Sequence, residues 1–200
     1  ISIFRSILKI DMIQVTIYIM SNITIIGHYF VGKTAIIRAF TNPDLPFDLK
    51  YEPTLGTSMS KIEYQGSTYL LWDTAGQEKY ASLAPTYFRN SNAAIIVYDV
   101  TSRQSFEAAE TWLSRYLDIV KVDNPIIIAA NKIDLTEDVQ VTAEEGRAYA
   151  ESHNFSFVEV SAKTGEHLED ILKILHEKLP PPPPKKEKPI EFHQNDNHCC

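Results

Sequence analysis

The stretch GHYFVGKT, Gly27–Thr34, decides the fold of this chain. It matches the phosphate-loop pattern G-x-x-x-x-G-K-S/T, in which backbone N–H groups and the N-terminus of the next helix hold phosphate oxygens. An apolar run, Ile23–Gly27, precedes it and a helical pattern, Lys33–Phe40, follows it, as the motif requires. We expect the lysine to contact the β- and γ-phosphates and the threonine hydroxyl to coordinate Mg²⁺. The expected nucleotide contacts in this loop are Gly27, His28, Tyr29, Phe30, Val31, Gly32, Lys33 and Thr34.

A second string, WDTAGQE, spans Trp72–Glu78 and follows an apolar strand pattern. A carboxylate at a strand end, here Asp73, can hold Mg²⁺ through a water, because Mg²⁺ prefers oxygen ligands and keeps several waters. Gly76 lets the backbone approach a γ-phosphate, and Gln77 is placed to orient an attacking water. A strand end followed by a turn would explain the glycine but not the whole string. We therefore expect Gln77 and Lys33 to be the catalytic residues.

The string NKID, Asn131–Asp134, follows another apolar strand pattern and selects the base. The Asp134 carboxylate can accept hydrogen bonds from the N1–H and the exocyclic amine of guanine, whereas adenine offers no such pair of donors. Ser161–Lys163, after the last predicted strand, adds a backbone N–H for the guanine carbonyl oxygen. An ATP-using enzyme with a phosphate loop is the alternative, and Asp134 argues against it. The expected base contacts are Asn131, Lys132, Asp134, Ser161, Ala162 and Lys163.

Apolar runs alternate with helical patterns along the chain, which is typical of a mostly parallel sheet covered by helices on both faces. Two runs flank Gln65-Gly66 and predict a hairpin, so one edge strand should be antiparallel. All the motifs follow strands, where open α/β sheets bind ligands. We predict an α/β fold of the P-loop type, with a six-stranded sheet of Ile23–Gly27, Thr57–Tyr64, Thr68–Trp72, Ala93–Tyr98, Pro125–Ala130 and Phe155–Val160. The predicted helices cover Lys33–Phe40, Phe106–Val120, a segment from Thr142 onward, and His167–Leu179.

Length and composition predict one domain with a tail. The 200 residues are 44% apolar and 22% charged, and the net charge of −7 argues against a nucleic-acid binder. We interpret residues 1–19 as non-native upstream sequence, or else as a genuine but poorly packed or disordered extension, because a first strand should start after Met20. Residues 20–179 form the expected domain. Five prolines begin at Pro180, so residues 180–200 are expected to be a disordered tail.

The motifs resemble those of the Ras superfamily of small GTPases, and within it the Rab proteins that regulate vesicle traffic. The resemblance covers residues 21–179 and includes Tyr80–Leu83, Ala84–Arg89 and Ile96–Thr101, and Ser82–Pro85 is most similar to the early-endosomal Rab subgroup. It implies a monomeric switch that binds and hydrolyses GTP with Mg²⁺, retains GDP, and works on the cytosolic face of endomembranes. The implied partners are an exchange factor, a GTPase-activating protein, a Rab escort protein, a GDP-dissociation inhibitor and effectors.

The same resemblance implies roles for residues outside the motifs. Tyr51–Thr54 is similar to the first switch, in which Tyr51 contacts the nucleotide and Thr54 adds a second hydroxyl ligand for Mg²⁺. Phe47 falls where the family places an aromatic ring against the guanine face. The implied metal ligands are thus Thr34, Thr54 and Asp73.

The implied second switch runs from Gln77 to about Tyr87, and the implied effector surface includes Trp72 and Tyr87. Met59 departs from the pattern, because Rab proteins usually present phenylalanine there, and this puts the identity of the effector in doubt. Asn90-Ser91 replaces the more usual Gly-Ala, a minor difference.

Tyr29 is the most consequential departure, because the family usually has glycine or another small residue there. A bulky ring would crowd the attacking water and an arginine finger, which is worth ~10³–10⁵ in rate. Two interpretations stay open. Either Tyr29 lies harmlessly over the nucleotide, or the chain is a GTP-dependent binding module with very slow hydrolysis.

Cys199 and Cys200 are the only cysteines and the last two residues. Because adjacent cysteines rarely pair with each other, they predict an intracellular protein without a disulfide framework. On a Rab-like protein, a terminal Cys-Cys resembles a double geranylgeranylation site. Two lipid chains give a stable membrane anchor where one gives only a marginal one.

Overall fold

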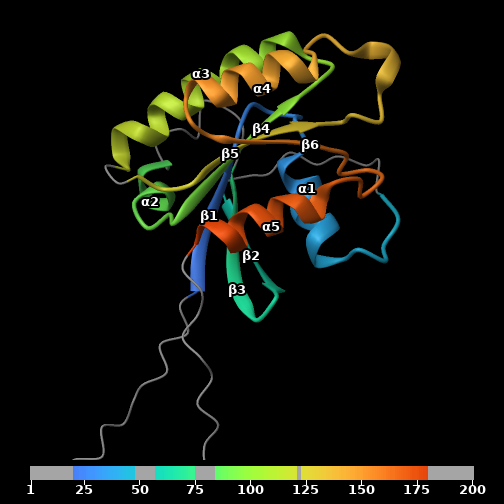
Figure 1. Ribbon diagram of the computed structural model, residues 1–200. Coiled ribbons are helices and arrows are strands. Elements are labelled where there is room, and N and C mark those ends of the chain that lie inside the picture. Colours follow the sequence, from blue (N-terminus) through green and yellow to red (C-terminus); the bar gives the residue numbers. More distant parts are fainter. Residues whose placement is uncertain (1–19, 48–56, 75–83, 121–122, 180–200) are drawn as a thin grey trace, which may run out of the picture.

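The computed structural model describes residues 20–47, 57–74, 84–120 and 123–179, which form one α/β domain (Figure 1). Its sheet has six strands in the order β2-β3-β1-β4-β5-β6. The strands are β1 Met20–Ile26, β2 Thr57–Tyr64, β3 Ser67–Thr74, β4 Ala93–Asp99, β5 Ile126–Asn131 and β6 Ser156–Val160. The helices are α1 Lys33–Thr41, α2 Ala84–Phe88, α3 Arg103–Ile119, α4 Ala143–Ser152 and α5 Leu168–Lys178, with a short 3₁₀ turn, η2, at Thr136–Asp138.

The strand pairing confirms the predicted topology. Strand β1 lies parallel to both β3 and β4, and the series continues in parallel through β5 to β6. Strand β2 pairs antiparallel with β3, with Tyr64 opposite Ser67. The two turn residues Gln65 and Gly66 both have positive φ, 47° and 81°, which suits a tight hairpin whose twist matches that of the strands. The predicted antiparallel edge strand is therefore confirmed.

Two hydrophobic clusters lie on opposite faces of the sheet and explain why its strands read as continuous apolar runs. Along β4, Ile95 and Val97 pack in the cluster of α1 and α5, whereas Ile96 and Tyr98 pack in the cluster of α2, α3 and α4. Successive side chains of a strand point to opposite faces, so a strand covered on both sides needs apolar residues throughout. Figure 1 shows the two layers, with α3 and α4 on one side of the sheet and α1 and α5 on the other.

Local sequence signals explain where the helices begin. The Ser102 hydroxyl accepts a hydrogen bond from the backbone N–H of Ser105 and caps α3. Thr142 caps α4, and the side chain of Glu145 reaches back to the Thr142 N–H, so the predicted capping box is present. Helix α3 begins three residues before the predicted Phe106, because this hydroxyl cap satisfies the first turn ahead of the apolar stripe.

Several expected boundaries were wrong by a few residues. Strand β1 begins at Met20 because Met20–Asn22 pair with Thr68–Leu70 of β3, although those first residues are not uniformly apolar. The strand ends at Ile26, since Gly27 has φ 146° and belongs to the loop. Helix α5 begins at Leu168, after His167 in a left-handed conformation. Residues 1–19 and 180–200, and the predictions made for them, lie outside the described residues.

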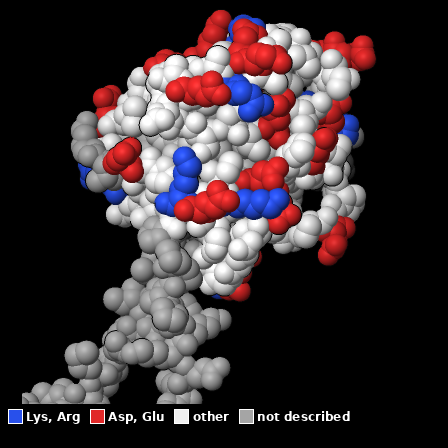
Figure 2. Space-filling view, in the orientation of Figure 1, with Lys and Arg blue, Asp and Glu red and all other residues white. Residues whose placement is uncertain are grey.

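No helix in the described ranges is long and apolar enough to cross a membrane. Figure 2 shows acidic and basic side chains interspersed over one face of the domain, with the acidic ones more numerous. Charged side chains of both signs are thus mixed over this face.

Candidate nucleotide-binding site

The backbone of the phosphate loop between β1 and α1 requires glycine at two positions. Gly27 and Gly32 have φ of 146° and 98°. A Cβ on Gly27 would lie 2.2 Å from the carbonyl oxygen of Val97, and one on Gly32 would lie 2.3 Å from Nδ2 of Asn131. Both glycines are therefore required by close approach as well as by conformation. Phe30 also takes a left-handed conformation, with φ 63°.

Lys33 lies at the start of α1 with its side chain inside the loop. Its residue is only 6% exposed, and Nζ donates hydrogen bonds to the carbonyl oxygens of Gly27, at 2.9 Å, and His28, at 2.7 Å. Burial lowers the pKa of Lys33 to about 8, and the nearby negative charge of Asp73 opposes that shift only in part. The loop therefore holds a buried cation that lacks a full counter-charge, as a site for an anion requires.

Thr34 and Asp73 bring two hard oxygen ligands together. The Thr34 hydroxyl donates a hydrogen bond of 2.7 Å to Oδ2 of Asp73, although the residues come from α1 and from the end of β3. Asp73 is 1% exposed. A hydroxyl and a carboxylate suit Mg²⁺, which binds oxygen ligands and completes its octahedron with waters or phosphate. The two residues thus fit the predicted magnesium site, and Thr54, the third predicted ligand, lies outside the described residues.

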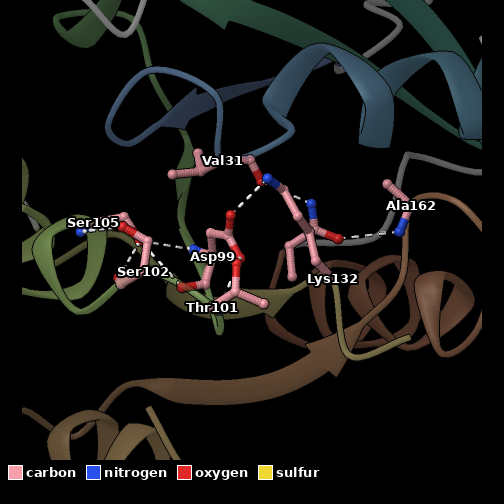
Figure 3. A network of polar contacts seen from close by, with 8 residues as sticks. Val31, Asp99, Thr101, Ser102, Ser105, Lys132 and Ala162 are labelled. Atoms are coloured by element: carbon pink, nitrogen blue, oxygen red, sulfur yellow. Dashed lines mark hydrogen bonds and ion pairs between the residues drawn. The ribbon is translucent and has the colours of Figure 1, made fainter. Parts of the chain in front are cut away.

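Asn131 links the phosphate loop to the loop after β6. Its Nδ2 donates a hydrogen bond of 2.7 Å to the carbonyl oxygen of Val31, and its Oδ1 accepts one of 3.0 Å from the N–H of Ala162. Asn131 is 1% exposed, so both ends of its amide are satisfied inside the protein (Figure 3). The residue therefore holds two loops at a fixed distance from each other.

Asp134 is oriented by residues of the Ser161–Lys163 motif. Its Oδ1 accepts a hydrogen bond of 2.7 Å from the Ser161 hydroxyl, and its Oδ2 lies 3.4 Å from Nζ of Lys163. The Asp134 side chain is 12% exposed, whereas that of Lys163 is 52% exposed. The carboxylate is thus held on one side by the buried Ser161 hydroxyl and approached on the other by the exposed ammonium group of Lys163. Such a carboxylate keeps lone pairs for donors on a ligand.

Lys132 makes a contact that the sequence patterns did not reveal. Its Nζ lies 2.6 Å from Oδ2 of Asp99, the last residue of β4 (Figure 3). Asp99 belongs to the string Tyr98–Thr101, which served above only as a family resemblance. The position of Asp99 directly after an apolar strand pattern could have indicated this contact, because the carboxyl ends of neighbouring parallel strands lie at one edge of the sheet.

A cavity of about 1120 Å³ opens along these loops. Its wall includes Phe30, Thr34, Phe47, Lys132, Ala162 and Lys163, all predicted to contact the nucleotide. This volume slightly exceeds the ~300–1,000 Å³ common for small-molecule sites, so a nucleotide fits within it. The cavity thus touches the phosphate loop, both base motifs and the predicted aromatic ring. Most of its wall comes from α1, residues 42–47 and residues 164–172, and Lys33, Asp73 and Asp134 do not line it.

A scan against family models matches the description "Ras family" over residues 22–180. The chain belongs to the Ras family of small GTPases. Among curated relatives, Ras-related protein Rab5 of Nicotiana tabacum is 38% identical over 168 residues, which are 80% of this chain and 81% of the relative. Ras-related protein Rab-31 of Homo sapiens is 35% identical over 180 residues, 88% and 87% of the two chains. Ras-related protein Rab-17 of Mus musculus is 37% identical over 168 residues, 80% and 76%.

The relatives place this GTPase in the Rab branch and confirm the predicted family, fold and activity. It is a Rab-type small GTPase of membrane traffic.

In this GTPase, three consecutive aromatic side chains occupy the phosphate loop. The ring of Tyr29 lies with its centroid 4.0 Å from that of His28 and 5.2 Å from that of Phe30. His28 is buried, whereas Tyr29 and Phe30 are 39% and 53% exposed. Tyr29 therefore stands at the surface of the loop with its ring supported on both sides by its neighbours.

The predicted effector residues also lie together. The rings of Trp72 and Tyr87 stack with centroids 6.1 Å apart, and the Trp72 indole N–H donates a 3.0 Å hydrogen bond to Oδ1 of Asn22. Met59 faces Trp72 across the β2–β3 pair and is 53% exposed. The exposed methionine and the two half-buried rings thus lie at the surface where the β2–β3 hairpin meets α2.

Five predicted roles fall on residues that the structure does not describe. Gln77 was expected to orient water, and Gly76, Tyr51 and Thr54 to contact the nucleotide or metal. The lipidation site is also outside the described residues, at Cys199 and Cys200.

Proposed function

We propose that this Rab-type GTPase binds GTP and GDP with Mg²⁺ and hydrolyses GTP slowly. We further propose that it acts in endosomal vesicle transport. The observation that carries the proposal is the Thr34–Asp73 pair beside the buried Lys33, at the cavity that Lys132 and Ala162 also line. In the proposed complex the phosphates lie against Lys33, Thr34 and Asp73, and the purine lies toward Lys132 and Ala162.

Lys33 neutralises phosphate charge. Its ammonium group donates hydrogen bonds to two backbone carbonyl oxygens, and its pKa of about 8 leaves it mostly protonated at pH 7. A phosphate oxygen is a better partner than a neutral carbonyl, because charge-assisted hydrogen bonds are roughly twice as strong. Bound phosphate should therefore raise the pKa of Lys33 and fix its charge.

Thr34 and Asp73 would hold Mg²⁺ in the nucleotide complex, with Thr54 as a further ligand. The ion would supply positive charge to the phosphate oxygens as negative charge develops on them. The Thr34 hydroxyl can turn from the Asp73 carboxylate to the metal without a change of backbone, because a hydroxyl carries both a donor and lone pairs.

The purine end reads guanine through Asp134, which accepts hydrogen bonds from N1–H and the exocyclic amine. Ser161 and Lys163 already orient that carboxylate. The Ala162 N–H is engaged with Asn131 and the Ser161 N–H with the Glu166 carbonyl oxygen, so the Lys163 N–H is the expected donor to the guanine carbonyl oxygen from this segment. Phe47 lines the cavity and is 41% exposed, which suits a ring that covers one face of the base.

Slow hydrolysis follows from Tyr29. Gln77 would orient the attacking water, and the exposed Tyr29 ring, supported by His28 and Phe30, would narrow the space for that water and for an arginine finger. The second candidate is a GTP-dependent binding module in which this effect abolishes useful turnover. The same observation favours it, and the hydrolysis rate separates the two.

The terminal Cys199 and Cys200 support a doubly geranylgeranylated membrane anchor, with an escort protein and a GDP-dissociation inhibitor as handling partners. Endosomal transport is supported by the resemblance of Ser82–Pro85 to the early-endosomal Rab subgroup. Mass spectrometry of the membrane-bound cellular protein tests the anchor, which is excluded if both thiols are free.

A competition experiment tests the nucleotide assignment. The full chain is stripped of nucleotide with a chelator and titrated with fluorescent GDP in the presence of Mg²⁺, GTP and ATP serving as competitors. We expect GTP to displace the probe at least ~10³-fold better than ATP, because a site built around required hydrogen bonds rejects a base that lacks them. Equal competition by the two triphosphates would contradict the proposal.

A further inference from the structure

Asp99 ends strand β4 directly beside the strand that carries the base motif. It lies opposite Asn131 in the β4–β5 register, and the N–H of the next residue, Val100, donates a 3.0 Å hydrogen bond to the Asn131 carbonyl oxygen. Asp99 is 7% exposed. A carboxylate is thus buried at the edge of the sheet where the phosphate loop and the base motif meet.

Each oxygen of Asp99 has its own partner. Oδ1 accepts hydrogen bonds from the N–H of Thr101, at 2.9 Å, and from its hydroxyl, at 2.7 Å. Oδ2 pairs with Nζ of Lys132 at 2.6 Å. The Asp99 N–H also donates a 3.0 Å hydrogen bond to the Ser105 hydroxyl at the start of α3. The carboxylate is therefore fixed from its own turn, and only its outer oxygen reaches toward another loop (Figure 3).

Lys132 depends on this contact for its orientation. Its backbone is in the left-handed region, with φ 70°, which is costly for a residue with a long side chain. The side chain is 31% exposed and lines the cavity together with Gly32 and Ala162. In Figure 3 the Lys132 side chain extends toward Asp99. An unanchored lysine chain would sample several rotamers and would often leave this wall.

We propose that Asp99 is a positioning residue for the nucleotide, because it holds the Lys132 side chain as a fixed wall between the phosphate loop and the Ser161–Lys163 loop. Asp99 does not touch the ligand and acts through Lys132. The inference rests on the proposed function, since it assigns the cavity to a nucleotide. It extends the guanine-binding machinery to a residue of β4 that belongs to none of the four motifs.

A double-mutant cycle on the full chain tests this role, with fluorescent GDP and Mg²⁺ as the probe. The variants are Asp99→Asn, Lys132→Met and the two together. Asparagine keeps an oxygen for both Thr101 donors, so the turn is retained and only the ion pair is lost. We expect Asp99→Asn to raise the dissociation constant for GDP about tenfold, mainly through a faster off-rate, as for the loss of one charge-assisted hydrogen bond. The double variant should bind no more weakly than Lys132→Met alone.

Asp170→Asn is the matched control. It removes the carboxylate from another aspartate–lysine pair, Asp170 and Lys173 at 2.9 Å, which is exposed on α5. We expect it to change GDP affinity less than about twofold, as is usual for exposed pairs. Thr101→Val is a second control, because it loosens the turn while leaving the ion pair in place. Its effect should stay below about threefold, that is, under one ordinary hydrogen bond.

Three results would overturn the inference. The first is unchanged GDP binding by a folded Asp99→Asn variant. The second is additive effects in the double variant, which would show that Asp99 acts independently of Lys132. The third is a loss in Thr101→Val equal to that in Asp99→Asn, which would reduce Asp99 to support of its own turn. If Asp99→Asn does not fold, Lys132→Met decides, because wild-type affinity in that variant leaves Asp99 nothing to position. Failure of the wild-type chain itself to bind GDP would instead refute the proposed function.

Discussion

Asn131 and Val31, 100 residues apart in sequence, are joined by a hydrogen bond of 2.7 Å from the Asn131 side chain to the Val31 carbonyl oxygen. The other end of the same amide accepts the Ala162 N–H at 3.0 Å. Three segments that come from different strands therefore share one buried side chain. This amide therefore fixes the spacing between the phosphate loop and the Ser161–Lys163 loop.

Replacement of Asn131 by alanine should loosen both ends of the site. The carbonyl of Val31 and the N–H of Ala162 would each lose a partner in a buried place, at ~1–3 kcal/mol per group. We expect a lower melting temperature for the GDP complex and a GDP off-rate at least tenfold higher, since ~1.4 kcal/mol is a factor of ten. Differential scanning fluorimetry and nucleotide-exchange kinetics measure the two effects. A variant with altered melting but wild-type exchange would show that the link does not control the site.

The pH dependence of stability should report on Lys33. Its folded pKa, about 8, lies below the unfolded value of 10.5, so between these values the unfolded chain binds more protons and stability rises with pH. We expect the nucleotide-free chain to become more resistant to urea from pH 8 to 9.5, a window that lies below the ordinary tyrosine pKa of about 10. In Lys33→Met this slope should disappear, because methionine carries no titratable group.

Lys173→Met is the control for that experiment. Hydrogen bonding to Asp170 raises the pKa of Lys173, so any stability it contributes is lost only as pH rises above the ordinary lysine range. Its removal should leave the slope between pH 8 and 9.5 unchanged. A slope that survives in Lys33→Met would mean that another group causes it.

Tyr98 offers a test of a buried polar atom away from the site. Its hydroxyl is buried and has no hydrogen-bond partner among the described residues, and burial raises the pKa of the phenol well above its usual range. Tyr98→Phe removes only that hydroxyl, so we expect equal stability or a gain of about 1 kcal/mol in urea unfolding. Tyr149→Phe, which loses a 2.6 Å hydrogen bond to Glu110, should not gain. A clear loss of stability in Tyr98→Phe would indicate a partner for this hydroxyl.

The motifs could be predicted because each consists of consecutive residues that follow a strand. Gly27, Lys33 and Asp73 can be recognised from their residue types and their order in the motifs. In a parallel sheet the carboxyl ends of the strands lie at one edge, so the motifs that follow them are expected to lie close together. The two-sided burial of β4 was likewise readable from its unbroken apolar run.

The features that could not be predicted depend on contacts between segments that are distant in the sequence. The Asp99–Lys132 pair joins two strand ends, and neither residue signals its partner in the sequence. The start of β1 at Met20 also depends on a distant segment. Pairing with β3 extends the strand through polar residues whose own strand propensity is low. The two hydrogen bonds of the Asn131 side chain could not be predicted either, because an amide in a base motif suggests contact with a ligand rather than with two loops.

Base selection should follow Asp134. An asparagine there presents an amide donor where guanine also presents donors, so affinity for GDP should fall at least ~10²-fold. Xanthine carries a carbonyl in place of the exocyclic amine and can accept that donor. We therefore expect Asp134→Asn to prefer xanthosine diphosphate over GDP in a competition assay. Loss of both nucleotides in a folded variant would show that the aspartate acts by supporting Ser161 rather than by reading the base.

Tyr29→Gly tests whether the Tyr29 ring limits the rate of GTP hydrolysis. If the exposed ring restricts the attacking water, its removal should raise the intrinsic rate of GTP hydrolysis by a decade or more, ~1.4 kcal/mol of barrier. Single-turnover conversion of bound GTP to GDP measures the rate, with GTP affinity determined separately so that binding and chemistry are not confused. Phe30→Ala is the comparison, because it removes a neighbouring exposed ring at the same loop. An equal rate in wild type and Tyr29→Gly would show that the ring lies harmlessly beside the nucleotide, and the binding-module interpretation would then fail.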